Sequence, residues 1–380
     1  MALESPIFNI KSQRKRFLIG VSIIAFIFNF STRIVDILLA NFISDELHAD
    51  VGLYTFFISL FNFANFIALT PVSALSDKIG RKPIIGFALF GYSFGVLMFY
   101  FSTELWHLVL FRIIQGISVF YGVILALIND YFEEGSRSKP LAFLSACLGF
   151  GFLFGSAMGG LFLEFIGGRS AFLYVGILDF FMVVFLFIFI KDVRVVQNTQ
   201  NTQNTKKITM NAKRTRSILL KNRDFKIAIV LQALRWCGFS AILPYLTWLI
   251  FNHYEIRDSL SGIILFPIVL CYIFGLATAG RAKQPNVILI RFFPILTFSA
   301  LSFLILGLID SILLFLLFGL FSAFCFGILL TANDSYAADI VPEEIRGESL
   351  GFYKTTGSFF GIIGPLISGF MAEQMDFLGP

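Results

Sequence analysis

The chain has 380 residues, of which 57% are hydrophobic and only 14% are charged, and its formal net charge is +5. Charged residues make up about a quarter of a typical soluble domain, so this composition excludes an ordinary soluble protein. The positive charge does not indicate nucleic-acid binding, because the basic residues gather in short loops between long apolar stretches.

Long apolar stretches follow one another along the chain. A stretch of about twenty apolar residues crosses the hydrocarbon core of a bilayer as a helix, and the helix satisfies all its backbone polar groups there. The sequence therefore predicts an all-α polytopic membrane protein with eleven membrane-spanning helices. These predicted spans are Phe17–Ile43, Val51–Ala74, Pro83–Ser102, Leu105–Asp130, Lys139–Glu164, Ser170–Ile190, Lys226–Phe251, Ser259–Gly280, Val287–Leu308, Ser311–Asp334 and Glu348–Glu373.

The loops between the spans alternate in charge. Arg16, Arg81 and Arg281 lie in loops on one side, whereas the loops on the other side carry acids such as Glu46 and Glu104. Lysine and arginine are enriched in cytoplasmic loops. The sequence therefore predicts a multi-pass protein of the cell (plasma) membrane with its N-terminus in the cytoplasm.

One long polar segment divides the chain into three parts. It runs over residues 191–225 and contains a repeated Gln-Asn-Thr tripeptide followed by basic residues. Such a composition forms no packed core, so we expect a flexible cytoplasmic linker. The predicted domains are an N-terminal six-helix bundle at residues 1–190, the basic linker at 191–225 and a C-terminal bundle of five helices at 226–380.

The two bundles are predicted to be parallel repeats of one unit. One constant offset superimposes charged loop residues and helix glycines of the two halves: Asp130 on Asp339, Arg137 on Arg346 and Gly155 on Gly364. Two parallel repeats are the architecture of a large class of secondary transporters. The second repeat is then expected to end with a twelfth helix, which is missing or truncated in this sequence.

The loop after the second span carries a recognisable motif. Ser73–Lys82 resembles the loop signature of the major facilitator superfamily (MFS), G-x-L-x-D-R-x-G-R-K, and matches it at Asp77, Gly80, Arg81 and Lys82. Glycine permits a tight turn, and an acid can pair with a basic group or a helix N-terminus. The resemblance implies a cytoplasmic gate, although the two basic residues alone could simply fix the topology. The other residues that we assign to this gate are Asp130, Arg137, Asp339 and Arg346.

Two further motifs are similar to patterns of the same family. Arg112 and Gln115 match R-x-x-Q-G, whose arginine is implicated in proton coupling in the family. Residues 151–160 resemble G-x-x-x-G-P-x-x-G-G, which is associated with proton-coupled drug antiporters, with Ser156 in place of the proline. Small residues at this spacing also let helices pack closely, so packing alone is the alternative. The predicted helix-packing glycines are Gly151, Gly155, Gly159, Gly160, Gly361 and Gly364.

Together these motifs resemble the MFS, in particular its drug:proton antiporter-like branch. The resemblance implies the MFS fold, with two pseudo-symmetric helical bundles and a central cavity lined by spans 1, 4, 7 and 10. It also implies a monomer embedded in the lipid bilayer that moves a small-molecule substrate, with the proton gradient as its energy source.

Charged residues inside the spans are the candidates for the transport pathway. A charge at mid-bilayer costs about 2.5–3.5 kcal/mol or more, so it should face a cavity or a partner. Arg33 and Asp36 lie on one face of the first span and either neutralise each other or serve transport. Asp36 is the favoured proton carrier, because burial and a nearby arginine act on its protonation in opposite directions. The full candidate set is Arg33, Asp36, Arg112, Gln115, Asp179, Arg235, Trp236 and Lys354.

Two members of this set can also be accounted for without a role in transport. Asp179 lies on a span that the family fold places at the periphery, so its role can equally be structural pairing. Lys354 lies in the eleventh span and can extend its ammonium group to the cytoplasmic interface.

These observations favour a proton-coupled exporter of small organic solutes. A surplus of positive charge in the cavity would instead favour a proton-coupled importer of organic anions or sugar acids. A third alternative is a membrane receptor or scaffold that does not transport. We do not expect an enzyme, a metal site, a cofactor or nucleic-acid binding, because the sequence has no metal-ligand spacing, phosphate-binding loop or nucleophile motif. The substrate, the direction of transport and the coupling ion are left open.

Overall fold

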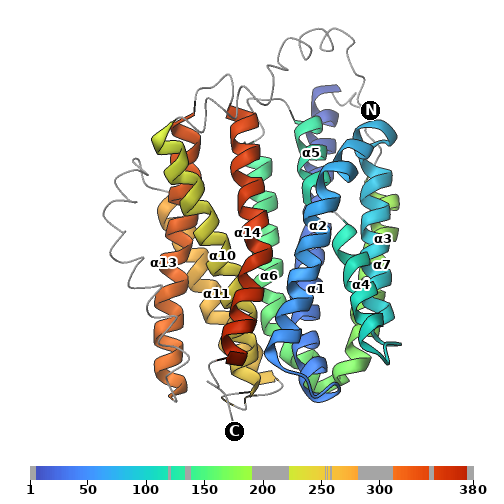
Figure 1. Ribbon diagram of the computed structural model, residues 1–380. Helices are drawn as coiled ribbons and strands as arrows, with labels where there is room; N and C mark the ends of the chain where they lie inside the picture. Colours follow the sequence, from blue (N-terminus) through green and yellow to red (C-terminus); the bar gives the residue numbers. More distant parts are fainter. Residues whose placement is uncertain are drawn as a thin grey trace. The chain divides into compact units, whose positions relative to one another are not determined.

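The computed structural model of the chain describes residues 6–118, 121–132, 138–190, 222–252, 254, 256, 259–280, 311–341 and 346–374. Within these ranges every regular element is an α-helix, as Figure 1 shows. The predicted all-α fold class is confirmed. The helices are α1 (Pro6–Asp45), α2 (Val51–Ile79), α3 (Arg81–Phe99), α4 (Leu105–Ile117), α5 (Tyr121–Tyr131), α6 (Ser138–Ile166), α7 (Gly168–Phe189), α10 (Arg223–Asn252), α11 (Ser259–Gly280), α13 (Ile312–Asp339) and α14 (Arg346–Gln374).

The predicted spans and the helices agree with two qualifications. The fourth span, Leu105–Asp130, is covered by α4 and α5, because Ser118 leaves the helical conformation with a ψ of 64°. The ninth span, Val287–Leu308, lies outside the described residues, as do residues 191–221 of the predicted linker. By length and composition, eight of the described spans are sufficiently long and apolar to cross a membrane.

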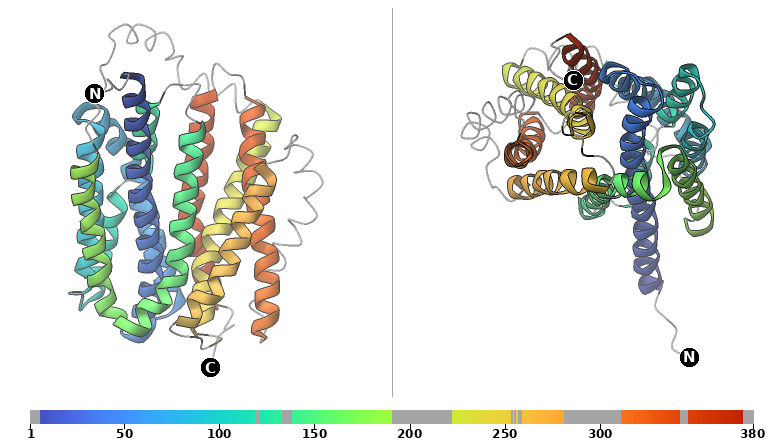
Figure 2. Two further views of the ribbon diagram at one scale, coloured as in Figure 1. Left: turned by 180° about the vertical axis from the view of Figure 1, so that it is seen from behind. Right: turned by 90° about the horizontal axis from the view of Figure 1, so that it is seen from below.

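The chain forms two compact units. Unit 1 contains residues 1–48, 60–195 and 257–263, and unit 2 contains residues 49–59, 196–256 and 264–380. In unit 1, α1 packs most extensively against α6, and α3 packs against α7 (Figure 1, Figure 2). In unit 2, α10 packs against α14. The first and fifth helices of each predicted repeat are therefore partners in both units.

The internal duplication is also visible in two close helix contacts. A Cβ atom on Gly116 of α4 would lie 2.6 Å from the carbonyl oxygen of Phe61 in α2. In unit 2, a Cβ atom on Gly327 of α13 would lie 2.2 Å from the carbonyl oxygen of Tyr272 in α11. The offset of 211 positions that takes Gly116 to Gly327 also takes Phe61 to Tyr272, and it exceeds by two positions the offset that takes Gly155 to Gly364. The same backbone-to-backbone contact thus occurs at matching positions of the two units.

Most of the predicted packing glycines lie where two helices approach closely. A Cβ atom on Gly151 or Gly155 of α6 would lie 2.2 or 2.4 Å from a carbonyl oxygen of α1, and one on Gly159 would lie 2.6 Å from an α1 side chain. Gly160 is buried. On α14, Gly364 meets the backbone of α10 in the same way, with a distance of 2.2 Å. Gly361 differs, because its Cβ atom would have only an ordinary contact at 4.0 Å.

Large apolar side chains remain exposed on the outside of the helices. Helix α7 presents a face of this kind, which in water would be unfavourable but in hydrocarbon costs nothing. Such a face is what a membrane-spanning helix at the protein–lipid boundary needs. The exposed residues of this face are Phe180, Phe181, Val184, Phe187, Ile188 and Phe189.

Candidate functional site

A buried ion pair links α1 and α4 of unit 1. Nη2 of Arg112 donates to Oδ1 of Asp36 at 2.8 Å, and Nη1 donates to Oε1 of Gln115 at 2.9 Å. The guanidinium also lies over the rings of Phe61 and Phe99, with its Cζ atom 5.5 and 6.0 Å from the ring centroids. The side chain of Arg112 is 1% exposed and that of Asp36 is 22% exposed. The acid is therefore the more accessible partner of the pair.

The acid that pairs with Arg112 comes from another helix, because α4 has no acid nearby. No acid lies near Arg112 on α4, and the carboxylate comes from a helix more than seventy residues earlier in the chain, with a sequence separation of 76. Cation–π contacts and the amide oxygen of Gln115 add to the stabilisation of the charge. A charge inside the membrane is thus held by several groups at once.

Arg33, the second cation of α1, contacts α6. Its Nε atom donates to Oγ of Ser156 at 3.1 Å, and its guanidinium lies over the ring of Phe152 at 5.2 Å. The side chain is almost fully buried. Ser156 occupies the position where the family pattern has proline, so in this chain the replacement provides a hydrogen-bond acceptor for a buried arginine.

Asp179 of α7 is fully buried in unit 1. Its Oδ2 atom accepts a hydrogen bond from Oγ of Ser31 at 2.5 Å, and its Oδ1 atom has no hydrogen-bond partner among the described residues. Asp36, by contrast, has a cation as its partner. The structure therefore joins Asp179 to α1 through a hydroxyl group.

The turn between α2 and α3 contains a compact group of charged residues. Gly80 alone separates the two helices and has a φ of 116°, a left-handed conformation that favours glycine. The next residue, Arg81, contacts Oδ1 of Asp77 at 2.5 Å, Oδ2 of Asp130 at 2.9 Å and Oγ of Ser76 at 2.6 Å. One guanidinium thus ties the ends of α2, α3 and α5 together.

The structure describes only some of the other residues assigned to the gate. The ammonium group of Lys82 donates to the carbonyl oxygen of Phe187 at 3.3 Å, which ties α3 to the end of α7. Asp339 is exposed at the end of α13. Arg137 and the side chain of Arg346 lie outside the described residues.

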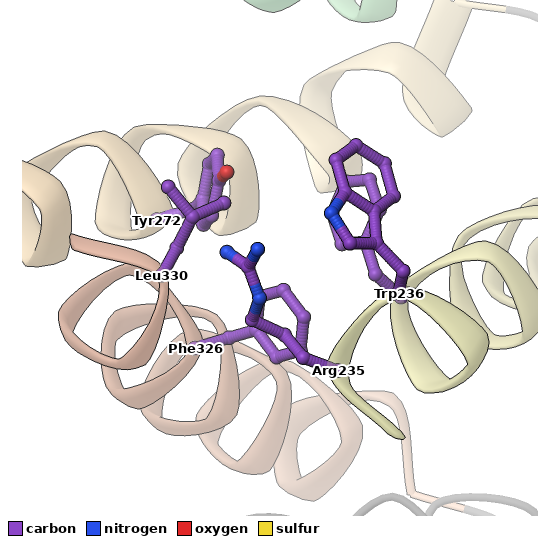
Figure 3. A pocket seen from close by; sticks show the side chains of 6 residues that line it. Arg235, Trp236, Tyr272, Phe326 and Leu330 are labelled. Atoms are coloured by element: carbon purple, nitrogen blue, oxygen red, sulfur yellow. The ribbon is translucent and has the colours of Figure 1, made fainter. Parts of the chain in front are cut away.

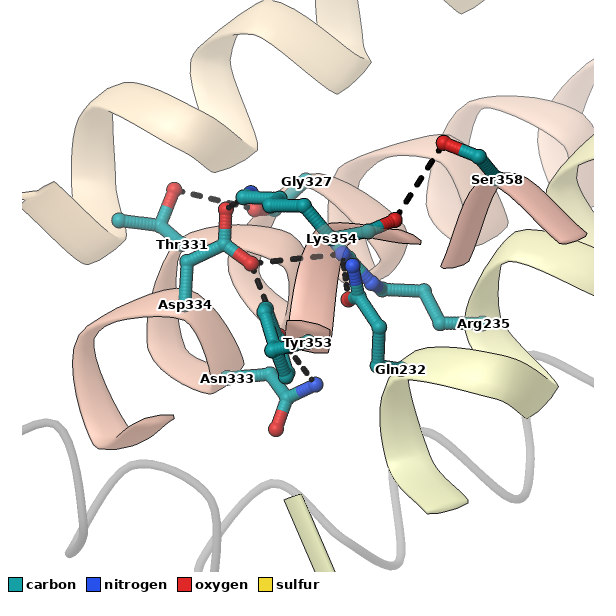
Figure 4. Close-up of polar contacts among 9 residues, drawn as sticks. All are labelled: Gln232, Arg235, Gly327, Thr331, Asn333, Asp334, Tyr353, Lys354 and Ser358. Atoms are coloured by element: carbon teal, nitrogen blue, oxygen red, sulfur yellow. Dashed lines mark hydrogen bonds and ion pairs between the residues drawn. The ribbon is translucent and has the colours of Figure 1, made fainter. Parts of the chain in front are cut away.

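A polar network surrounds Arg235 in unit 2, which we call the Arg235 network (Figure 4). The Nη2 atom of Arg235 donates to Oε1 of Gln232 and lies 3.4 Å from Oδ1 of Asp334. Asp334 also accepts a hydrogen bond from the hydroxyl group of Tyr353 at 2.9 Å and pairs with Nζ of Lys354 at 2.5 Å. One carboxylate of α13 therefore receives groups from both α10 and α14.

A small pocket lies beside the Arg235 side chain, and we call it the aromatic pocket. Figure 3 shows the guanidinium of Arg235 pointing into the space between the labelled side chains. About 190 Å³ of space lies among its walls, part of it open to the surroundings. Its lining residues come from α10, α11 and α13 and are Arg235, Trp236, Phe239, Tyr272, Phe326 and Leu330.

The two units hold their buried arginines in comparable ways. In each unit a glutamine three residues away on the same helix accepts a hydrogen bond from the arginine, and an acid on another helix pairs with it. The donor and acceptor helices are exchanged. Arg112 belongs to the fourth helix of its repeat and Asp36 to the first, whereas Arg235 belongs to the first and Asp334 to the fourth.

Sequence reasoning did not assign a role to several residues of these groups. Gln232, Ser156 and Asp334 were not among the candidates, although each is a direct partner of a buried arginine. The signal for Asp334 is that an Asn-Asp pair lies near the end of both the fourth span and the tenth, although the offset that relates the two halves places Asp339 opposite Asp130. Within the described part of the chain, no group of three or more histidine, cysteine or acidic residues is arranged to hold a metal ion.

Comparison with known proteins identifies the family of the chain. A family model described as "Major Facilitator Superfamily" matches residues 21–365. The tetracycline resistance protein, class H, of Pasteurella multocida is 25% identical over 332 residues, which are 84% of this chain and 79% of that protein. The class B protein of Escherichia coli is 26% identical over 306 residues, which are 77% of this chain and 72% of that protein.

A solved structure shows the same fold. The bacterial homologue of the human lysosomal transporter Spinster, in an inward-facing and unoccupied conformation, matches with a TM-score of 0.77 at 16% identity. The match covers 98% of this chain and 84% of that one. At this low identity the likeness concerns the fold, and it agrees with the duplicated helical units described above.

Proposed function

The chain belongs to the Major Facilitator Superfamily and is therefore a membrane transporter rather than an enzyme, and from this premise we propose that it exports small organic solutes in exchange for protons. The observation that carries the proposal is the ion pair of Arg112 and Asp36. A transporter coupled to protons needs an acid that gains and loses a proton during the cycle. We assign this role to Asp36, because its side chain is partly exposed while that of its partner Arg112 is buried.

Protonation of Asp36 changes its interaction with Arg112. A neutral carboxyl group no longer attracts the guanidinium, and a carboxylate that loses its cation is in turn more readily protonated. Proton binding and the ion pair therefore exclude each other. Because Asp36 lies on α1 and Arg112 on α4, breaking the pair loosens the contact between two helices of unit 1. The proton is thereby linked to helix packing.

The direction of transport is supported by the relatives. The two similar proteins are tetracycline resistance proteins. A membrane transporter gives resistance by lowering the amount of drug inside the cell, which favours export. The glycine pattern of α6, where α1 and α6 approach closely, supports the same direction through the exporter motif that it resembles.

We assign the group around Arg81 to a gate at the cytoplasmic side. Its two carboxylate partners, Asp77 and Asp130, lie on α2 and α5, so the three helix ends move together while these contacts hold. We propose that at least one of these contacts breaks when this side opens. The basic residues at this end of the helices also support a cytoplasmic N-terminus.

The proposal is tested with purified protein in liposomes that contain the pH-sensitive dye pyranine. Tetracycline, ethidium and benzoate are added outside in turn, and the lumenal pH is recorded with no imposed gradient. Export by exchange predicts that entry of a transported solute drives protons outward, so the lumenal pH rises. A fall in lumenal pH, or no change with any of the three solutes, contradicts the proposal.

Two variants separate coupling from folding. Asp36→Asn keeps the shape of the side chain and removes its exchangeable proton, so solute entry is expected without a lumenal pH change. Glu46→Gln is the matched control, because Glu46 pairs with Arg169 at the exposed ends of α1 and α7. This control should retain the pH change. An unaltered pH response in Asp36→Asn removes Asp36 from the mechanism.

A second candidate function is the import of an organic anion together with protons. The observation that favours it is Arg235, which has two buried nitrogen atoms, Nε and Nη1, without a hydrogen-bond partner among the described residues. The liposome experiment distinguishes the two functions, because co-transport predicts that the lumen becomes more acidic as the solute enters.

A further inference from the structure

The aromatic pocket is too small for an organic solute but large enough for one small particle. Within it, about 20 Å³ is wide enough for a particle the size of a water molecule. A buried water molecule needs about 10–15 Å³ by the same measure, so the pocket takes one such particle and no aromatic ring. A chloride ion is only slightly larger than a water molecule. The size of the pocket therefore restricts its occupant to a single water molecule or a monatomic ion.

The side chains that line the pocket offer hydrogen-bond donors and no carboxylate. Arg235, Trp236 and Tyr272 carry polar hydrogens, and the other lining side chains are apolar: Phe239, Phe326 and Leu330. These donors would satisfy the oxygen of a water molecule, but among these side chains only the hydroxyl group of Tyr272 could accept one of its hydrogens. A halide ion accepts hydrogen bonds and donates none. The lining side chains therefore suit an anion better than water.

The guanidinium of Arg235 supplies donors that no described residue accepts. The residue is only 6% exposed, and its Nε and Nη1 atoms have no hydrogen-bond partner in the described part of the chain. Only Nη2 is engaged, by Gln232 and by Asp334. Unpaired buried donors of a charged group are unfavourable. Figure 3 shows the guanidinium pointing into the space between the lining side chains, so an anion in that space accepts hydrogen bonds from it.

The charges of the Arg235 network do not cancel (Figure 4). Arg235 and Lys354 share one carboxylate, that of Asp334, so these two cations and one anion have a net charge of +1. The carboxylate lies nearer to Lys354, at 2.5 Å, than to Arg235, at 3.4 Å. A charge that is not compensated inside a membrane span is unfavourable. One monovalent anion beside Arg235 makes the network neutral.

The sequence of the ninth span offers no carboxylate for Arg235. This predicted span, Val287–Leu308, lies outside the described residues and contains neither aspartate nor glutamate. Its charged residue is Arg291, which adds positive charge. Compensation of Arg235 from this span is therefore excluded by composition alone, whatever the position of the span.

We propose that the aromatic pocket binds one monatomic anion, with Arg235 as its main ligand and chloride as the abundant ion that fits. The ion accepts charge-assisted hydrogen bonds from the guanidinium and compensates the net charge that Asp334 leaves. The site belongs to unit 2, whereas Asp36 and Arg112 belong to unit 1, so the inference goes beyond the proposed proton exchange and does not depend on it.

The first test measures chloride binding to the purified full chain in nanodiscs of uncharged lipid. Exchange with a protein site broadens the ³⁵Cl NMR signal, and empty nanodiscs supply the correction. Bromide, a monatomic ion of nearly the same size, should reverse the broadening, whereas gluconate at the same ionic strength should not. The absence of protein-dependent broadening, or equal reversal by gluconate, overturns the proposal.

The second test is thermal unfolding of the same sample at constant ionic strength, with chloride replaced stepwise by gluconate. At a chloride concentration ten times its dissociation constant, binding raises the ratio of folded to unfolded protein about tenfold. The melting temperature of the wild type should therefore fall as chloride is withdrawn. A melting temperature that stays constant over the whole series contradicts the proposal and indicates that water occupies the pocket.

Three variants assign the chloride effects to the pocket. Leu330→Phe fills the pocket without removing a polar partner of Arg235, so it should abolish both the broadening and the chloride-dependent stability. Arg235→Gln removes the cation and should abolish both as well. Arg169→Gln is the matched control, because this arginine pairs with Glu46 at the exposed end of α7, and it should behave like the wild type. Chloride effects that persist in both pocket variants refute the assignment, and the two wild-type tests stand even if a variant fails to fold.

The anion site and the proposed function can fail independently. Both chloride effects in a protein that shows no solute-driven pH change in liposomes would retain the anion site and remove the exporter. A solute-driven pH change in a protein without either chloride effect would remove the anion site and retain the exporter.

Discussion

Two glycines on one helix allow the helix packing to be tested quantitatively. Gly361 and Gly364 both lie on α14, three residues apart. A Cβ atom on Gly364 would lie 2.2 Å from the carbonyl oxygen of Cys237 and 2.2 Å from Oγ of Ser240 on α10. A Cβ atom on Gly361 would have only one neighbour among the described residues, the ring of Trp236 at 4.0 Å. The same substitution should therefore have opposite effects at the two positions.

The expected magnitudes follow from these distances. A carbonyl oxygen does not rotate away, so Gly364→Ala forces α10 and α14 apart locally by about 1 Å in a tightly packed region. Overpacking of this kind destabilises a protein by about 1–3 kcal/mol, which is about a 5- to 150-fold change in the unfolding equilibrium. Gly361→Ala meets no obstacle and should stabilise the helix by up to about 1 kcal/mol, because alanine loses less backbone freedom.

The assay is reversible unfolding by SDS in mixed micelles, followed by tryptophan fluorescence. The free energy of unfolding should rank Gly361→Ala, wild type and Gly364→Ala in descending order. A matched pair in unit 1 is Gly20→Ala, whose Cβ atom would lie 3.6 Å from Ile190, against Gly151→Ala, at 2.2 Å from the oxygen of Phe26. Equal stabilities within either pair would refute the claim that these glycines are required by close helix contact.

Three further predictions concern the gate, the buried acid and the topology. Arg81→Gln should lower the free energy of unfolding by no more than about 1 kcal/mol, because the partners of Arg81 are partly exposed. The same variant should slow solute transport several-fold, and an unchanged transport rate argues against a gate. Asp179→Asn keeps an acceptor for Ser31 and should leave the pH dependence of transport unchanged, whereas a shifted pH profile places Asp179 in the proton path. In a cysteine-free background, Thr103→Cys should react with a membrane-impermeant maleimide added to intact cells and Lys78→Cys should not, and the reverse pattern would invert the proposed orientation.

The fold was predictable because the bilayer restricts the possible structures so strongly. Apolar stretches of sufficient length must be helices, so the predicted spans agree with the described helices wherever the two overlap. A duplication was correctly indicated by the charged loop residues and glycines that superimpose under one offset. The structure reflects it, because α1 packs against α6 as α10 packs against α14. The break at Ser118 was not predictable from hydropathy, since the sequence around it is as apolar as the rest of the span.

The partners of the buried charges were harder to predict than the charges themselves. Arg112 and Arg235 stood out as costly groups inside apolar helices, but their acids, Asp36 and Asp334, lie 76 and 99 residues away. Helix pairing decides which side chains meet, and a single sequence does not specify the rotation of one helix against another. The role of Ser156 was hidden for the same reason, because it becomes visible only when Arg33 is seen to face α6.

The central claim is that Asp36 either carries a proton or forms the ion pair with Arg112, and that this proton is exchanged for the exported solute. The most direct measurement is the proton count on solute binding, made by adding tetracycline to the purified protein in a weakly buffered solution that contains a pH indicator. The wild type should release protons in proportion to the tetracycline bound, and Asp36→Asn should bind it without release. Proton uptake by the wild type, or equal release by both proteins, would contradict the account.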